Sequence, residues 1–365
     1  MVFFTRRKDA KQPRRSAWWV TFAGLIGAVL FIVSYSAYWF LMANQLRSAV
    51  DSWRNEFRAA GGVADWRQLD IYGFPFWLYA DVTALRLGRP VVADSWFWEV
   101  SRAAATLRPW NFHHLSLDLA GEHAFQFTAE GRALPLEGAA ITLDIDLERL
   151  TENTWQANAG IEGISLIGPE DIGNISISGA KATVRRLHPI KNHLLPTWEL
   201  ELSGRGIALP VSFDLPLGRD VARLTLDARL LGQLQPGLLV DILPKWRDAG
   251  GTVEIGHMEM EWGPLLVRGD GTIALDASLQ PIGAFIANAQ GFFEVLEGFR
   301  RQGIIDNRDA MTASIVLGML SRRPTGGGVS TISIPLSVQL QTLYAGPLSV
   351  AKLPEVRWTG AMPSY

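Results

Sequence analysis

The hydrophobic pattern begins with a stretch from Ser16 to Leu46 that contains no charged residue. Its apolar centre, residues 17–43, would form a helix about 40 Å long at ~1.5 Å per residue, longer than a ~30 Å hydrocarbon layer. Trp18 and Trp19 stand at one end, and Tyr38 and Trp39 lie near the other. Aromatic residues of this kind mark both interfaces of membrane-spanning helices. We therefore predict a transmembrane helix over residues 17–43, with these four side chains at the interfaces.

A second helical pattern comes directly after it, over residues 44–61. Leu46, Val50, Trp53 and Phe57 fall on one stripe of a helix, and Gly61-Gly62 is a typical stop. The stripe favours docking on the next domain of the chain. The alternative is a seam with a partner chain at Trp53 and Phe57, although the stripe is short for a coiled coil.

After Gly62 the apolar residues recur with a period of two instead of the helical period. Clear examples of apolar and polar residues in alternation lie at 141–148, 199–202, 224–230 and 332–341. This pattern is typical of antiparallel strands with one buried and one solvated face. Glycine-containing segments between the runs, including Gly168-Pro169, Gly179 and Asp270-Gly271, predict turns.

Helical spacing returns in three places of the second half. We predict a short helix near 235–248 that is bent at Pro244, and a helical pair over 291–303 and 307–321 that lies on a sheet. Two β-rich halves, 62–190 and 191–365, are expected to share one continuous sheet or to face each other.

Charge is distributed unevenly along the chain. Residues 1–16 hold six basic side chains and one acid, whereas the remainder is acidic and the whole chain has a net charge of −2. A basic tail before a span predicts a cytoplasmic N-terminus and a translocated C-terminal part. A cleavable signal peptide is the alternative, with Ser34-Tyr35-Ser36 as its cleavage site, but its apolar region is normally ~7–15 residues. The near-neutral balance argues against nucleic acid as a partner.

The candidates for chemistry are weak. The absence of cysteine excludes disulfides and thiolate sites. Residues 269–274 fit G-x-G-x-x-A, but residues 272–276 alternate like a strand, so a hairpin turn is favoured over a dinucleotide site. The carboxylate pairs Asp144/Asp146, Glu199/Glu201 and Glu259/Glu261 are interpreted as solvated strand faces. The six histidines show no metal-binding spacing. We predict no catalytic residue, no metal and no cofactor.

Several short motifs resemble one bacterial family. They are Ile71-Tyr72-Gly73-Phe74-Pro75-Phe76, Trp98, Arg108-Pro109-Trp110, Trp262-Gly263-Pro264-Leu265 and Leu343-Tyr344-Ala345-Gly346-Pro347. Together with the preceding span, they resemble the DUF2125 family of alphaproteobacterial membrane-anchored proteins, which has no assigned function. The layout is also similar to AsmA-like envelope proteins, in which a span precedes a long curved β-sheet implicated in lipid handling. The matching residues Gly73, Phe74, Pro75, Phe76, Trp98, Trp110, Trp262, Gly263 and Pro264 are structural in type. At Gly73–Pro75 we expect a tight bend with Phe74 and Phe76 buried.

The predicted fold is mainly β, of the α+β kind. An N-terminal transmembrane helix precedes an antiparallel curved or sandwich-like periplasmic sheet and a C-terminal helical pair. The favoured function is a non-enzymatic inner-membrane protein that handles a lipid or other apolar ligand, because an anchor, many alternating strands and 14 tryptophans occur together. The alternatives are an envelope scaffold that acts through protein contacts and a periplasmic hydrolase.

Overall fold

The computed structural model describes residues 15–90, 95–129, 132–187, 195–211, 217–235, 237–303, 305–322, 329–346, 348–356, 358 and 361–362. The fold is mainly β, with an N-terminal apolar helix, a large antiparallel sheet and C-terminal helices, as predicted. Most of the basic tail, residues 1–14, lies outside the described residues, and so does the predicted boundary between the two halves at 190/191.

The first element is one uninterrupted helix, α1 (Arg15–Ala59), which joins the predicted span and the segment after it. It is long and apolar enough to cross a membrane, and its most apolar 18-residue window is entirely unburied with a mean hydropathy of 2.0. The helix ends at the predicted glycines, where Gly61 has a φ of +82° and the Gly62 amide donates to the Phe57 carbonyl oxygen.

Seventeen strands of the described residues form one sheet. Those before residue 190 are β1 (Val63–Asp65), β2 (Gln68–Tyr72), β3 (Leu78–Arg89), β4 (Trp96–Arg108), β5 (Asn111–Asp118), β6 (Gly121–Ala129), β7 (Arg132–Arg149), β8 (Trp155–Ile167) and β9 (Asn174–Arg186). Those after it are β10 (Pro196–Ala208), β11 (Asp220–Leu231), β13 (Thr252–Trp262), β14 (Leu265–Leu275), β15 (Pro281–Gln290), β16 (Ile332–Gln339), β17 (Thr342–Ala345) and β18 (Leu348–Lys352). A separate small pair is formed by β12 (Gly237–Leu238) and β19 (Ala361–Met362).

The large sheet is an antiparallel meander. β1 and β2 both pair with β3, and β5 and β6 both lie between β4 and β7. From β7 onward each strand pairs with the next along the sheet, through to β18. Because β9 pairs with β10, the two halves belong to one continuous sheet.

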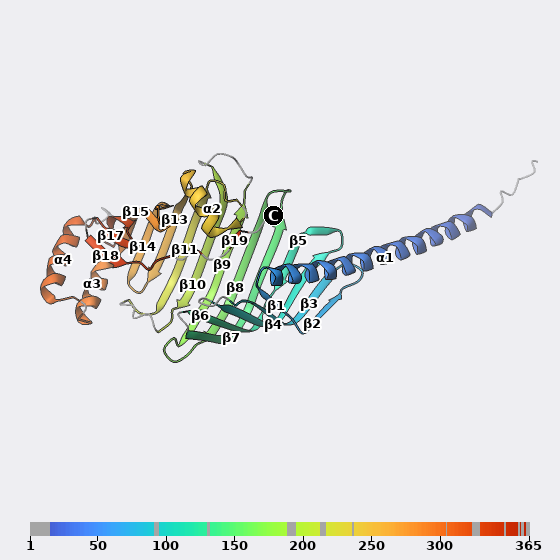
Figure 1. The fold of residues 1–365 in the computed structure, drawn as a ribbon, viewed down its shortest axis with the longest axis horizontal. Helices are drawn as coiled ribbons and strands as arrows, with labels where there is room; N and C mark the ends of the chain where they lie inside the picture. Colours follow the sequence, from blue (N-terminus) through green and yellow to red (C-terminus); the bar gives the residue numbers. More distant parts are fainter. Residues whose placement is uncertain are drawn as a thin grey trace, which may run out of the picture.

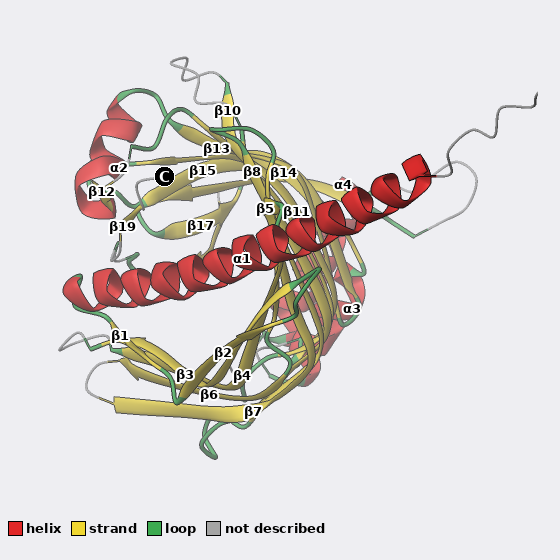
Figure 2. Ribbon diagram, turned by 90° about the vertical axis from the view of Figure 1, so that its right-hand side faces the viewer, coloured by secondary structure: helices red, strands yellow, loops and turns green. Residues whose placement is uncertain are grey.

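The sheet is strongly curved. Figure 2 shows it as a C in cross-section, with α2 (Leu239–Asp248) and the C-terminal end of α1 at the open side. α1 projects from one end of the sheet, and α3 (Phe292–Arg301) and α4 (Asn307–Leu320) lie at the other end (Figure 1). α2 contains Pro244, and α3 and α4 form the predicted C-terminal pair.

Buried side chains gather where a helix meets the sheet. Trp39 of α1 packs on Leu78 and Leu107. Leu243 and Trp246 of α2 pack on Leu275 and its neighbours. Phe292 of α3 and Leu317 of α4 pack on Ala289, Ile332 and adjoining residues. These three clusters include no residue of β7, β8, β9 or β10.

Two local predictions are wrong. Residues 74–76 do form the expected tight turn, but Phe74 and Phe76 are 49% and 63% exposed, because the turn lies at the end of the sheet and has only α1 on one side. Gly179 and Asp270-Gly271 are not turns but lie inside β9 and β14. In both strands the glycine faces a neighbour that leaves no room for a Cβ: the Arg205 side chain at Gly179 and the Phe285 ring at Gly271.

Candidate functional site

One face of the sheet is apolar across most of its strands. A single row of directly paired residues crosses thirteen strands, from Ile71 on β2 to Ile334 on β16, without a polar side chain. The complete row is Ile71, Ala80, Ala105, Leu117, Ile145, Ala159, Ala182, Leu202, Leu226, Met258, Gly269, Ala287 and Ile334. The row two residues along each strand has the same character, with members such as Leu147, Val184 and Leu200. At ~4.8 Å per strand, this face is about 60 Å long.

The opposite face is mostly polar in the row one residue along each strand. The neighbouring row is Asp70, Asp81, Ala104, Asp118, Asp144, Gly160, Lys181, Ser203, Thr225, Glu259, Arg268, Asn288 and Ser333. Since successive side chains on a strand point to opposite faces, one register gives the sheet two chemically different surfaces.

The apolar face lies on the concave side of the sheet. Leu78 and Leu107, which contact α1, and Leu230 and Val253, which pack against the α2 cluster, belong to it. Figure 2 places α2 and the C-terminal end of α1 at the open side of the C. We call this concave surface, defined by the apolar row and its same-face neighbours, the trough.

The central part of the trough has no protein cover among the described residues. From Leu117 to Met258 every side chain of the row is half-buried, and the fully buried members, Ala80 and Ala287, lie near its ends. An apolar surface of this extent is far larger than a soluble protein ordinarily leaves open to water. Its shape and chemistry suit long hydrocarbon chains that lie along it.

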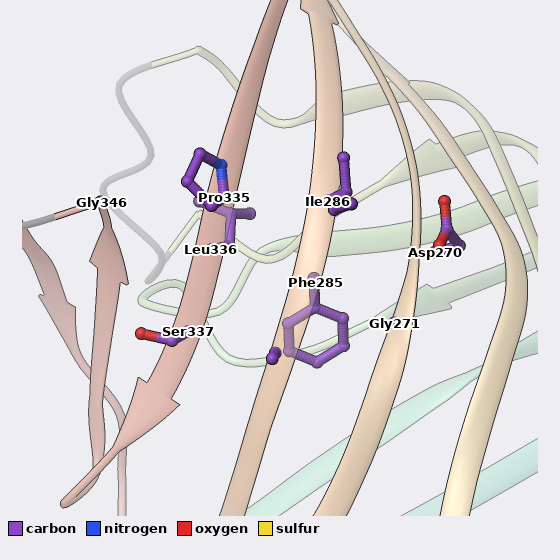
Figure 3. Close-up of a pocket in the computed structure, with 9 residues that line it drawn as sticks. Asp270, Gly271, Phe285, Ile286, Pro335, Leu336, Ser337 and Gly346 are labelled. Carbon is purple, nitrogen blue, oxygen red and sulfur yellow. The ribbon is translucent and has the colours of Figure 1, made fainter.

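A hollow of about 460 Å³ lies over β14, β15 and β16, near the distal end of the sheet (Figure 3). Its lining includes Asp270, Ile286 and Pro335, which the register places on the face opposite to the trough. The Phe285 ring lies over Gly271, where a Cβ would come within 2.3 Å of it, and Leu336 pairs with Phe285 on the next strand. Small residues on β14 thus make room for a large aromatic ring on β15.

Ion pairs on the polar face engage Glu199, Glu201 and Glu259 of the predicted carboxylate pairs. Glu259 accepts a hydrogen bond from Arg268 at 2.6 Å, and this bond lowers the pKa of its carboxyl group. Arg185 lies 3.8 Å from Glu199 and 3.1 Å from Glu201. Among the described residues no three His, Asp or Glu side chains are placed to share a metal ion. The interpretation of these carboxylates as a solvated face is therefore consistent with the structure.

One serine, histidine and aspartate cluster was not anticipated from the sequence. Ser116 on β5 pairs with Asp146 on β7, and the Ser116 hydroxyl donates to the Asp146 carboxylate, while His114 Nε2 lies 3.4 Å from the serine oxygen. Nucleophile activation needs the serine proton directed at the histidine. Here the carboxylate accepts the hydrogen bond from the hydroxyl, and the His114 and Asp146 side chains are about half exposed. The arrangement is a surface hydrogen-bond network, which the strand register alone could have revealed.

A buried histidine lies on β6. His123 on β6 is 2% exposed, and the Trp98 indole N–H donates to its Nδ1 at 3.1 Å. The ring stacks with Trp98 and Phe125. Burial lowers the pKa of His123.

A family model described as "Uncharacterized protein conserved in bacteria (DUF2125)" matches residues 39–354. The chain belongs to the DUF2125 family. The match covers the docked part of α1 and nearly all of the sheet. Neither the curated proteins nor the solved structures include a significant match.

Four residues of the DUF2125 chain were predicted to lie at membrane interfaces. Trp18 and Trp19 are 82% and 73% exposed on α1. Tyr38 is 38% exposed, and its hydroxyl donates to the Pro109 carbonyl oxygen at 2.6 Å. Trp39 is only 4% exposed and donates to the Trp77 carbonyl oxygen. Its ring therefore packs between helix and sheet and does not face the surroundings, which corrects the prediction for this residue.

The predicted partner seam is partly used within the chain. Leu46 packs against the cluster formed by Trp39, Leu78 and Leu107, which agrees with the docking interpretation. The Phe57 ring lies against Gly62, where a Cβ would come within 2.3 Å. Trp53 is 44% exposed and stacks on Phe57 at 5.6 Å.

The remaining family motifs shape turns and hold strands. Gly73 has a φ of +112°, and a Cβ there would approach the Tyr79 ring and the Trp77 carbonyl oxygen within 3 Å. Gly263-Pro264 forms the hairpin turn between β13 and β14. Trp262 donates to the Gly218 carbonyl oxygen at 2.9 Å, across to the segment before β11. Trp110, at the turn between β4 and β5, is 56% exposed.

Proposed function

We propose that this DUF2125 protein is an inner-membrane protein whose periplasmic trough binds the acyl chains of a bilayer lipid. The observation that carries the proposal is the thirteen-strand apolar row, which faces inward on a curved sheet and is half-buried, with no cover from the described residues in its centre. Water contact with so much apolar surface is unfavourable by about 25 cal/mol per Å², and bound hydrocarbon removes that contact.

The position of α1 at one end of the sheet supports the same function. α1 leaves the sheet at the end formed by β2–β5, and the strands succeed one another away from it (Figure 1). An anchor at this end places the near end of the trough at the membrane and its far end away from it. The basic residues before α1 favour a cytoplasmic N-terminus and hence a periplasmic sheet. The similarity in layout to AsmA-like envelope proteins is consistent with lipid handling.

A non-enzymatic role is part of the proposal. Several of the described carboxylates, such as Glu259, engage in surface ion pairs, and the Ser116 hydroxyl donates its hydrogen bond to Asp146 and not to His114. Binding of an apolar chain needs no reactive group, only a dry surface of adequate length.

The proposal is tested with two neighbouring residues of β11 that face opposite sides. Leu226→Glu places a charge on the trough, whereas Thr225→Glu places the same charge on the polar face. Full-length protein is purified from membranes in a mild detergent, and the co-purifying lipid is counted by native mass spectrometry. We expect the Leu226→Glu protein to retain at least ~5-fold less lipid than the Thr225→Glu protein.

Both variants keep α1, so lipid that surrounds the helix contributes equally to both measurements. Far-UV circular dichroism verifies that both sheets are folded. Equal lipid content in the two folded variants would contradict the proposed function.

A further inference from the structure

Two turns of the sheet are fastened to α1 at one level of the helix. The first turn, residues 73–77, joins β2 to β3, and the second, Pro109-Trp110, joins β4 to β5. They are neighbours, because Leu78 at the start of β3 pairs with Leu107 near the end of β4. Three hydrogen bonds from α1 hold them: Tyr35 to the Pro75 oxygen at 2.5 Å, Tyr38 to the Pro109 oxygen at 2.6 Å and Trp39 to the Trp77 oxygen at 3.0 Å.

Both turns expose large aromatic side chains. Their residues form a group that we call the aromatic rim: Phe74 (49% exposed), Phe76 (63%), Trp77 (36%), Trp110 (56%) and Phe112 (47%). The Arg108 guanidinium lies 5.0 Å from the centre of the Trp77 ring, so a cation is held beside the aromatic surface. Exposed aromatic rings next to an arginine are the composition of a membrane–water interface, where rings lie among headgroups and cations meet phosphates.

The length of exposed α1 places the rim at that depth. Side chains from Trp18 to Ser34 are exposed throughout, and contact with the sheet begins at Tyr35. Seventeen residues of helix span about 26 Å, slightly less than the ~30 Å hydrocarbon layer. A bilayer that covers this segment therefore reaches the level of Tyr35, where the first turn is fastened.

We propose that the aromatic rim inserts into the interface of the bilayer leaflet that faces the β domain. The inference rests on the anchoring part of the proposed function and not on lipid binding in the trough. The occupant is a phospholipid surface, because the rim is continuous with the exposed apolar segment of α1 and is hydrogen-bonded to the helix itself. The inserted rim holds the near end of the trough at the leaflet surface.

The natural absence of cysteine allows single labels to report depth. Phe76→Cys labels the rim, Ile26→Cys labels the exposed helix, and Met319→Cys labels an 81% exposed apolar position on α4 at the far end of the molecule. Each full-length variant carries an environment-sensitive nitrobenzoxadiazole probe. The proteins are reconstituted into phosphatidylcholine–phosphatidylglycerol vesicles that contain lipids spin-labelled either near the headgroup or deep in the acyl chain.

We expect the probe at 26 to be quenched most by the deep spin label, and the probe at 76 most by the shallow one. Quenching at 76 should exceed that at 319 at least ~3-fold. If the probe at 26 is quenched but the probe at 76 is quenched no more than the one at 319, the insertion of the aromatic rim is contradicted, whereas the membrane anchor is not. Absence of quenching at both 26 and 76 would contradict both the membrane anchor and the insertion of the rim. Lipid binding in the trough is tested separately, by the lipid that co-purifies with the protein.

Discussion

The folded structure disfavours protonation of His123. It is buried beside Trp98, and its Nδ1 accepts the indole hydrogen, so a proton added there would replace an accepted hydrogen bond with a repulsive contact. The pKa of His123 in the folded protein therefore lies below the ordinary value of 6.5, whereas the unfolded chain keeps that value. Below about pH 6.5 the unfolded state binds the proton more readily, and stability falls as the pH falls.

We expect the apparent unfolding temperature of the wild-type protein to decrease between pH 7 and pH 5.5. His123→Gln, which keeps a side chain able to accept the indole hydrogen, should show a flatter profile over this window. Differential scanning fluorimetry of the full-length protein in detergent measures both. The same slope in wild type and variant would show that His123 does not carry this pH dependence.

Individual side chains show where sequence reasoning was limited. Trp39 looks like an interface anchor in a linear sequence, and only the docking of α1 on Leu78 and Leu107 reveals it as a buried contact. Phe74 and Phe76 read as core residues because they are apolar and flank a tight turn, yet the turn lies at the margin of the sheet. In both cases exposure depends on which element covers the residue, and hydrophobicity does not contain that information.

At the scale of elements, period-two alternation predicted the strands and the glycine signals predicted only some of the turns. Gly168-Pro169 begins a turn, but Gly271 lies within β14, where a missing side chain admits the Phe285 ring. The sequence alone does not distinguish a glycine inside a strand from a glycine in a turn, because the difference depends on which side chain of the neighbouring strand lies against it. The helical pair was correctly predicted because its stripes have a period distinct from that of the sheet.

A pair of glycine substitutions tests this account of strand packing. Gly271→Ala would place a Cβ 2.3 Å from the Phe285 ring and 2.5 Å from the Ala284 carbonyl oxygen, so we expect a loss of about 1–3 kcal/mol. Gly160→Ala on β8 meets no heavy atom within 4 Å and should be neutral or slightly stabilising. Chemical denaturation of both variants provides the measurement. Equal stability of the two would show that the Phe285 ring does not depend on the space at Gly271.

At the scale of the whole molecule, the alternation of apolar and polar residues predicted that the sheet has an apolar and a polar face, but it did not predict the trough. The sequence shows that Leu202 and Leu226 share a polarity class, and only the register shows that they are paired members of one row across thirteen strands. Curvature and the position of the helices then leave the centre of this row without cover from the part of the chain that the structure describes. The lipid hypothesis could be stated from the sequence, whereas the surface that would carry it required the structure.

The claim that the trough binds acyl chains is tested most directly by site-specific photocrosslinking in membranes. p-Benzoylphenylalanine replaces either Leu226, on the trough, or Thr225, one residue earlier on the polar face. Cells are grown with a radiolabelled fatty acid and irradiated, and the purified full-length protein is analysed for covalently bound lipid. We predict labelled lipid on the protein substituted at 226 and little at 225, and equal labelling at both positions, or none at either, would contradict the account.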